Sequence, residues 1–137
     1  RAHHPTTEKD VKAYQELLAK NLVEPSQMEI FIMNADGSQQ TPITKNGRAN
    51  FAPYFLPDGK RVIFSSNLST PENHQGPPSF HLYVINDDGT GLEQITFEGN
   101  FNSFPMFSPD GTKRAWSSDR NAASRVEYNI FIADWVP

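Results

Sequence analysis

The stretch FLPDGKRVIFSSN at residues 55–67 returns, little changed, as FSPDGTKRAWSSD at residues 107–119. Both segments carry a leading Phe, a Pro-Asp-Gly triplet, a basic residue before an apolar run, and two serines. Aligning residues 28–67 on residues 80–119 without gaps, an offset of 52, gives 14 identical residues in 40 positions. Self-similarity at a fixed period indicates that the chain is built from repeated supersecondary units.

Each copy is interpreted as four short strands separated by defined turns. In the Pro-Asp-Gly triplet, Pro presets a turn's φ angle, Asp bonds its own backbone and Gly accepts a positive φ, so the triplet predicts a hairpin. An Asp-Gly pair after the third strand predicts a second tight turn. A third copy contributes NIFIAD at residues 129–134. In the two fuller copies, the first strand is predicted at 50–55 and 102–107, and the second at 61–66 and 113–118. The third strand is predicted at 29–34 and 81–86, and the fourth at 41–44 and 93–96.

The repeat predicts a radial arrangement of sheets. One four-stranded antiparallel sheet cannot bury both of its faces, whereas sheets stacked around an axis can. We therefore predict an all-β fold, a partial β-propeller of about two and a half four-stranded antiparallel blades, with one N-terminal amphipathic helix. The alternative, an antiparallel sandwich, does not normally repeat its turns at a fixed offset. The predicted division is a helix-containing loop segment at 1–27 and blades at 28–137, with repeat units 28–67 and 80–119 and a partial unit 126–137.

The repeated motifs resemble the TolB-like, or Tol-type, β-propeller repeat. They stand here as IFIMNADGSQQTPIT with APYFLPDGKRVIFSSN, and as LYVINDDGTGLEQIT with FPMFSPDGTKRAWSSD. The resemblance covers about residues 28–137 and is closest to the C-terminal part of longer bacterial Tol biopolymer transport components. It implies a ring with more blades than this chain supplies, so the rest would come from another chain or from copies of itself in an oligomer. The broad family also provides the propellers of tricorn-like and prolyl-oligopeptidase-like peptidases.

Residues 6–22, TTEKDVKAYQELLAKNL, are predicted to form an amphipathic helix. Thr7 is a suitable N-cap, and Asp10 follows it in the position of a capping box. The helix could recognise a partner, or it could cover a blade or the mouth of the channel. Its narrow stripe of ordinary core residues favours the covering role. That stripe consists of Val11, Tyr14, Leu18 and Leu22.

Composition narrows the class of partner. Lys and Arg number 12 and Asp and Glu number 16, which gives a net charge of −4. This balance argues against a nucleic-acid partner, because phosphate binding needs clustered basic residues. The absence of cysteine excludes disulfides and thiolate metal sites. No apolar run is long enough to predict a membrane span.

The sequence offers no recognisable catalytic constellation. There is no Gly-x-Ser-x-Gly nucleophile elbow. Ser65-Ser66 and Ser117-Ser118 occur in both copies, and a residue repeated in every blade is interpreted as structural. The Asp-Gly turns lack the later ligands of a calcium loop. We therefore predict no catalytic residues and no cofactor.

The four histidines, His3, His4, His74 and His81, give one further alternative. His3 and His4 together with His74 could hold a metal, as histidines do with manganese in oligogalacturonate-lyase propellers. No His-x-His or His-x₃-His spacing supports that site, so the prediction is that no metal is bound. His81 alternates with Phe80 and Leu82 and is predicted to lie on a solvated strand face.

One end of a propeller collects the loops that lead into the first strands and the long loops after the second strands. Exposed aromatic and Arg side chains there are typical interface anchors, although Phe51 and Phe101 could instead pack between blades. We call this end the loop face. It comprises residues 45–50, 67–79, 97–102 and 119–128 with Phe51. The predicted partner-binding residues on it are Arg48, Asn50, Phe51, His74, Phe101, Asn102, Arg120 and Arg125. The Pro-Asp-Gly turns lie at the other end, where tight turns predict poorer pockets.

The predicted function is a non-catalytic protein–protein interaction module, part of a Tol-type propeller of the bacterial cell envelope. The partner is a protein or peptide, and the periplasmic or secreted location follows from the resemblance alone. Two alternatives remain: an accessory propeller of a prolyl-oligopeptidase-like or tricorn-like hydrolase, and a metal-dependent sugar-acting propeller.

Overall fold

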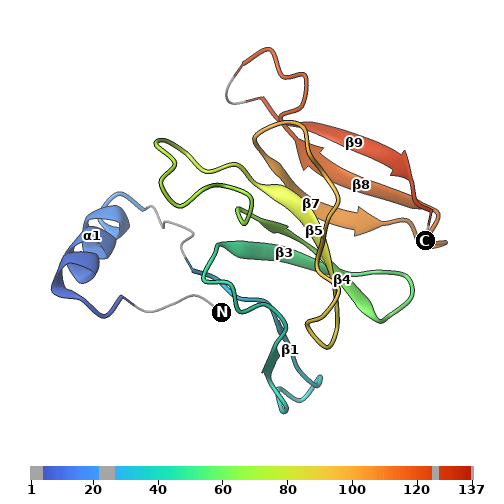
Figure 1. The fold of residues 1–137 in the computed structure, drawn as a ribbon, viewed down its shortest axis with the longest axis horizontal. Helices are drawn as coiled ribbons and strands as arrows, with labels where there is room; N and C mark the ends of the chain where they lie inside the picture. The colour runs from blue at the N-terminus through green and yellow to red at the C-terminus, as the bar shows by residue number, and fades with distance from the viewer. Residues whose placement is uncertain (1–4, 22–26, 125–126, 137) are drawn as a thin grey trace.

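A computed structural model describes residues 5–21, 27–124 and 127–136, which form one helix and nine strands (Figure 1). The six longest strands begin and end at the predicted residues, because the turn chemistry between them fixes their ends. The elements are α1 (Glu8–Leu18), β1 (Phe31–Ile32), β2 (Thr41–Pro42), β3 (Asn50–Phe55), β4 (Arg61–Ser66), β5 (His81–Asn86), β6 (Glu93–Gln94), β7 (Asn102–Phe107), β8 (Lys113–Ser118) and β9 (Asn129–Asp134).

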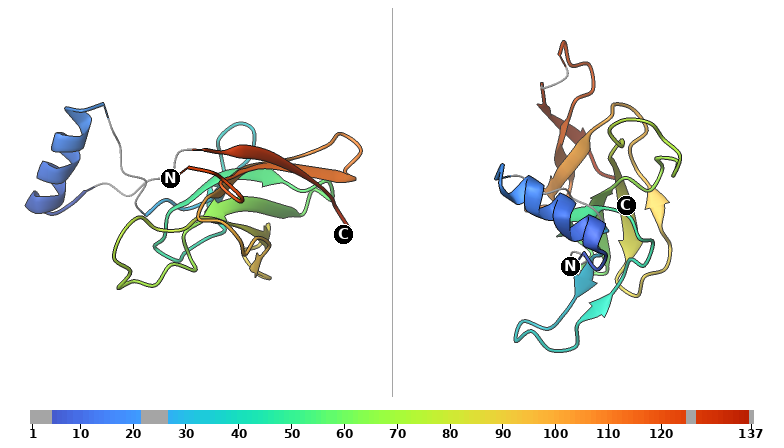
Figure 2. Two further views of the ribbon diagram at one scale, coloured as in Figure 1. Left: turned by 90° about the horizontal axis from the view of Figure 1, so that it is seen from above. Right: turned by 90° about the vertical axis from the view of Figure 1, so that its left-hand side faces the viewer.

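The strands form three antiparallel sheets in chain order, β1-β2, β3-β4-β5-β6 and β7-β8-β9. We call them the half-blade, the first blade and the second blade. Strand β7 packs against β3, β4 and β5, so the second blade lies alongside the first (Figure 2). Strands β1 and β2 are shorter than predicted. The equivalent strand of the first blade, β5, pairs along its whole length with β4, the second strand of that blade. Within the described residues, no strand equivalent to β4 pairs with β1.

The Pro-Asp-Gly triplets make the predicted hairpin turns. The Asp58 carboxylate accepts hydrogen bonds from the backbone N–H groups of Lys60 and Arg61, at 2.8 and 3.0 Å. Asp110 accepts from the Ser108 hydroxyl and from the Thr112 backbone, and these hydrogen bonds lower the pKa of Asp110 to about 2. Gly59 and Gly111 follow with φ of 67° and 72°, a conformation that glycine adopts without strain.

The first strand of each blade carries the same bulge. The pairing register shifts between Phe51 and Tyr54 in β3 and between Ser103 and Met106 in β7. The bulged residues Ala52 and Phe104 have φ of 52° and 54°, which is uncommon for residues other than glycine. A bulge re-aims the side chains around it, and Phe104 is 58% exposed as a result.

The core lies between the sheets, in two junctions. The first junction joins the half-blade to the first blade through Ile30, Ile43, Val62, Phe64, Tyr83 and Ile85. The second junction joins the two blades through Leu56, Ile63, Leu82, Val84 and Trp116, with Phe131 and Ala133 packed against them. Alternate residues of β4 and β5 therefore face opposite neighbours, as the period of two in a strand requires.

Helix α1 has the predicted N-cap, but it ends at Leu18, earlier than predicted, and it packs differently. The Thr7 side chain accepts a hydrogen bond from the Asp10 N–H, which confirms the N-cap. No residue of α1 is buried, and α1 packs against none of the described strands (Figure 2). Val11, Tyr14 and Leu18 are exposed, and Leu22 lies outside the described residues. Among the described residues, α1 therefore makes no contact that supports the predicted covering role. No helix in the described part of the chain is long and apolar enough to cross a membrane.

Candidate functional site

A chain of aromatic rings crosses the loop face from the first blade to the second. Phe51 contacts Phe80 and Phe104 edge-on, with ring centroids 5.2 and 6.2 Å apart. Phe101 lies 6.2 Å from Phe80, 6.3 Å from Phe104 and 5.0 Å from Tyr128. We call these five residues the aromatic cluster. Phe104 and Tyr128 are its most exposed members, at 58% and 53%.

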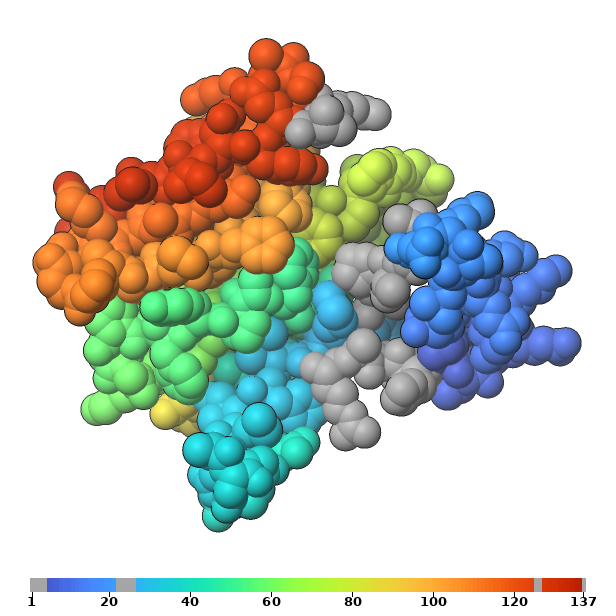
Figure 3. Space-filling model, turned by 180° about the vertical axis from the view of Figure 1, so that it is seen from behind, coloured from blue at the N-terminus to red at the C-terminus, as the bar shows by residue number. Residues whose placement is uncertain are grey.

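The cluster is positioned by the starts of the strands. Phe51 and Phe104 belong to β3 and β7, the first strands of adjacent blades, whose residues abut on the surface in Figure 3. Phe80 and Phe101 form a parallel bridge between the residues that precede β5 and β7. Edge-to-face contacts at these distances are favourable for aromatic rings. The cluster therefore both closes the gap between the blades and leaves apolar surface open to solvent.

Two predicted cations of the loop face form ion pairs with exposed carboxylates. Arg48 lies 3.6 Å from Glu72, and Arg120 lies 3.4 Å from Glu98. Each pair ties the loop before a blade's first strand to the loop after its second strand. The side chains of Glu72 and Glu98 are 89% and 74% exposed, so the two ion pairs contribute little to stability.

Asn50 and Asn102 are buried and do not present side chains to a partner, which corrects the exposure we predicted for them. Asn50 donates to the Met28 carbonyl at 2.8 Å and accepts from the Ser66 hydroxyl at 2.8 Å. Asn102 accepts from the Ser118 hydroxyl at 2.9 Å. The repeated asparagine thus serves a structural role with the second serine of each Ser-Ser pair. Its burial was not visible from one strand's sequence, because the neighbouring blade creates it.

The first serine of the Ser65-Ser66 pair forms a hydrogen bond across the second junction. The Ser65 hydroxyl donates to the Asn102 carbonyl at 2.8 Å. The recurrence of the second serine is explained by its hydrogen bond to the buried asparagine in both copies.

His81 is also buried, so the prediction of a solvated strand face is wrong. Its Nδ1 lies 3.5 Å from the Asn102 side-chain nitrogen. Burial lowers the pKa of His81, and the nearby charge of Asp119 opposes that shift. The residue at the same register in the preceding copy, Glu29, accepts a hydrogen bond from Asn50 at 3.1 Å.

Of the remaining predicted residues, only His74 lies within the described part of the chain. His74 lies in an exposed loop, with Nε2 3.2 Å from the Pro77 carbonyl. Arg125, His3 and His4 lie outside the described residues. Among the described residues, no group of three or more His, Asp or Glu side chains could hold a metal ion.

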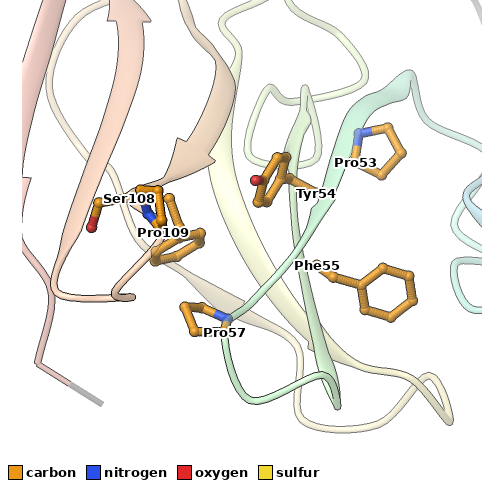
Figure 4. Close-up of a pocket in the computed structure, with 7 residues that line it drawn as sticks. Pro53, Tyr54, Phe55, Pro57, Ser108 and Pro109 are labelled. Carbon is orange, nitrogen blue, oxygen red and sulfur yellow. The ribbon is translucent and has the colours of Figure 1, made fainter.

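A pocket of about 620 Å³ lies at the opposite end, between the Pro-Asp-Gly turns of the two blades (Figure 4). Tyr54 and Phe107 line it with ring centroids 6.2 Å apart. Tight turns had predicted poorer pockets at this end than at the loop face, and that comparison stays a prediction. The signal in the sequence was the set of prolines and aromatic residues around each triplet. The lining residues are Pro53, Tyr54, Phe55, Pro57, Phe107, Ser108 and Pro109.

Comparison with known proteins gives a family match across most of the chain. Residues 15–131 match the family described as the TolB beta propeller domain. A TolB-type protein of Agrobacterium tumefaciens has a similar structure, with a TM-score of 0.64 at 22% identity over 79% of this chain and 38% of that one. TolB of Acinetobacter baumannii has a TM-score of 0.59 at 27% identity over 77% and 24%. These likenesses confirm the predicted partial propeller.

Two curated proteins are related in sequence. Dipeptidyl-peptidase 5 of Porphyromonas endodontalis is 28% identical over 92 residues, which are 66% of this chain and 12% of the relative. An uncharacterized protein of Agrobacterium fabrum is 27% identical over 85 residues, 62% of this chain and 26% of the relative. The chain thus spans no more than 26% of the length of these two relatives.

Proposed function

Because this chain belongs to the TolB beta propeller domain family, we propose that it is a non-catalytic protein–protein interaction module of a bacterial cell-envelope propeller. The observation that carries the proposal is the aromatic cluster, which runs without a break from the first blade to the second. Its partner is a protein or peptide that lies across the loop face.

The chemistry of the loop face suits protein recognition. Large aromatic side chains bury much apolar area at small entropic cost and dominate the energetics of interfaces. Phe104 and Tyr128 offer that area. Arg48 and Arg120 add guanidinium groups to the loops of the same face, each paired with an exposed carboxylate. The rings are held by one another and by two sheets, so binding needs little ordering of the free protein.

The cell-envelope location is supported by the two TolB structures of bacterial origin. We expect the natural protein that carries these residues to be found in the periplasmic fraction. Recovery of the protein only from the cytoplasmic fraction would contradict this part of the proposal.

The test is loss of partner binding on truncation of the cluster. The chain is immobilised and exposed to a bacterial envelope extract. A captured protein is identified by mass spectrometry, and its affinity is then measured with purified components. We expect Phe104→Ala and Arg48→Ala each to weaken binding by about tenfold, as interface anchors do. Met33→Ala is the matched control, because Met33 is 58% exposed like Phe104 and lies outside the cluster.

Unchanged capture by both variants would exclude the loop face as the binding site. Circular dichroism of each variant shows whether the fold is retained, so that a loss of binding is not confused with unfolding.

A second candidate is the accessory propeller of a hydrolase, favoured by the likeness to a dipeptidyl-peptidase. In that case the longer natural protein would hydrolyse dipeptidyl substrates and react with a serine-directed fluorophosphonate probe. The 137-residue chain has no Gly-x-Ser-x-Gly elbow, so the label would fall on residues outside it. A natural protein that shows neither activity nor labelling removes this candidate.

A further inference from the structure

The pocket between the Pro-Asp-Gly turns is held in place by a direct contact of one turn with the other. Gly111 of the second blade packs so closely on Pro57 of the first blade that a Cβ atom at position 111 would lie 2.8 Å from the Pro57 Cβ. Gly111 also has a φ of 72°, so a side chain there would be strained as well as crowded. The spacing of the two turns is therefore fixed, and the pocket between them is a feature of the fold.

Tyr54 and Phe107 provide the aromatic wall of this pocket. Their ring planes are inclined by 38°, and Trp135 holds Phe107 edge-on with centroids 5.2 Å apart. In Figure 4, Tyr54 points toward Ser108, whereas Phe55 points away from it. Tyr54 is 43% exposed, and its hydroxyl makes no hydrogen bond within the described residues. The pocket thus presents apolar ring surface beside a hydroxyl that is free to donate.

Asp110 adds a carboxylate beside this pocket. The hydroxyl of Ser108, a lining residue, donates to Asp110 Oδ1 at 2.5 Å. The backbone N–H and the hydroxyl of Thr112 donate to the same oxygen at 3.0 and 2.8 Å. Oδ2 takes part in none of these bonds, and Asp110 forms no ion pair within the described part of the chain. Because these hydrogen bonds lower the pKa of Asp110 to about 2, the carboxylate is ionised at neutral pH.

Two of the three basic residues that follow the triplets already have carboxylate partners. Arg61 lies 2.6 Å from Asp58, and Lys113 lies 2.6 Å from Asp134. Asp134 is the main cause of the raised pKa of Lys113, and the charge of Asp110 adds least to it. The carboxylate of Asp110 is therefore left to accept a cation from outside the chain.

We propose that the pocket between the Pro-Asp-Gly turns binds a proline-rich peptide that also carries a basic residue. Such peptides adopt the polyproline II conformation, which has no internal hydrogen bonds, and they dock on aromatic-lined grooves. The prolines pack on the rings of Tyr54 and Phe107, and a peptide carbonyl accepts from the Tyr54 hydroxyl. The basic side chain pairs with Asp110 and is attracted to the ring faces. This site goes beyond the partner proposed for the loop face, because it lies at the opposite end of the blades.

The probe is an acetylated and amidated peptide of sequence Pro-Pro-Arg-Pro-Pro. One matched peptide has citrulline in place of arginine, which keeps the shape and removes the charge. A second matched peptide has alanine in place of each proline. Dissociation constants are measured with the 137-residue chain at low salt by NMR titration, and the shifted amides show where each peptide binds.

We expect the arginine peptide to bind about fivefold more tightly than the citrulline peptide. Asp110→Asn should remove this difference, since asparagine keeps an oxygen acceptor for Thr112 and loses the charge. Asp88→Asn is the matched control. Asp88 accepts the same two hydrogen bonds from Thr90, at 2.9 and 2.6 Å, but its turn packs beside Ile43 at the first junction. The control should keep the preference for arginine.

Tyr54→Ala should weaken binding of the arginine peptide by about tenfold, as the loss of an aromatic anchor does. Phe104→Ala should leave it unchanged, because Phe104 belongs to the aromatic cluster of the loop face. This pair of variants separates the peptide site from the partner site proposed above, so that either proposal can fail without the other.

Three results would overturn the proposal. Equal affinity for the arginine and citrulline peptides would remove the role of Asp110. An alanine peptide that binds as tightly as the proline peptide would assign the site to a cation alone. Shifts confined to the loop face, or no binding of any of the three peptides, would show that the pocket is not a peptide site.

Discussion

The first and second junctions share one strand arrangement but carry different side chains at one equivalent position. Both contain a stacked ring pair, Phe64 with Tyr83 in the first and Trp116 with the partly buried Phe131 in the second. The first is otherwise aliphatic, whereas the second holds Arg114 at the register of Val62. The ring pair is therefore the shared requirement of a junction, and the position beside it varies.

Arg114 shows how a cation is accommodated there. Its guanidinium carbon lies 4.6 Å from the centroid of the Trp116 ring and 5.5 Å from that of Trp135. Burial lowers the pKa of Arg114, and the charge of Arg120 lowers it further. Within the described residues its Nε and Nη1 have no hydrogen-bond partner. Attraction to two indole faces offsets part of the cost of desolvation.

The largest effect we expect tests the ring pair. Phe64 is fully buried in the first junction. Phe64→Ala should lower the free energy of unfolding by about 3–5 kcal/mol, through lost transfer free energy and the cavity left behind. Phe97→Ala is the control, since Phe97 is 73% exposed, and it should change stability by less than about 0.5 kcal/mol. Urea denaturation measures both, and equal losses would show that the ring pair does not hold the junction.

A smaller effect is expected from the asparagine that links blades. Asn102→Ala leaves the Ser118 hydroxyl without its acceptor and the Glu98 carbonyl without its donor. Buried polar groups left unpaired should lower the free energy of unfolding by about 2 kcal/mol. Asn100→Ala is the matched control, because Asn100 is exposed in the same loop and contributes its backbone to the blade contact. A variant at Asn102 as stable as the control would remove the structural role.

Strand positions were predictable because they depend on local chemistry. The Pro-Asp-Gly and Asp-Gly turns fix the ends of the hairpins wherever a second strand is present. The predicted length of β1 was too long, because a strand's length depends on the strand that pairs with it, and the local sequence pattern does not report that partner.

The site was less predictable because burial there is created between blades. Asn102 and His81 alternate as surface residues of a single sheet would, yet both lie under the neighbouring sheet or loop. Phe51 and Phe101 were identified, but Phe104 was missed, because its exposure depends on a bulge with a positive φ. The pocket beside Tyr54 arises only when two triplets come together across blades.

The smallest expected effect is a pH dependence of stability at one repeated position, which is Glu29 in the first copy and His81 in the second. Because burial lowers the pKa of His81 from 6.5, the folded protein favours the neutral ring. Its contribution to stability is fully present above the unfolded-state value and is lost as the pH falls below it. A proton on Nδ1 would also face the Asn102 side-chain N–H group, against the attraction of Asp119.

His81→Asn copies the residue that the third repeat has at this register, Asn129, and removes the titration. The free energy of unfolding is measured in urea at about pH 7.5 and about pH 5.5 for both proteins. We expect wild type to lose more stability between the two values than the variant does. Asp110, with a pKa of about 2, does not titrate in that window, and other groups cancel between the two proteins. A wild type that gains stability at the lower pH would show that Asp119 outweighs burial, and that the second junction prefers a charged residue at this register.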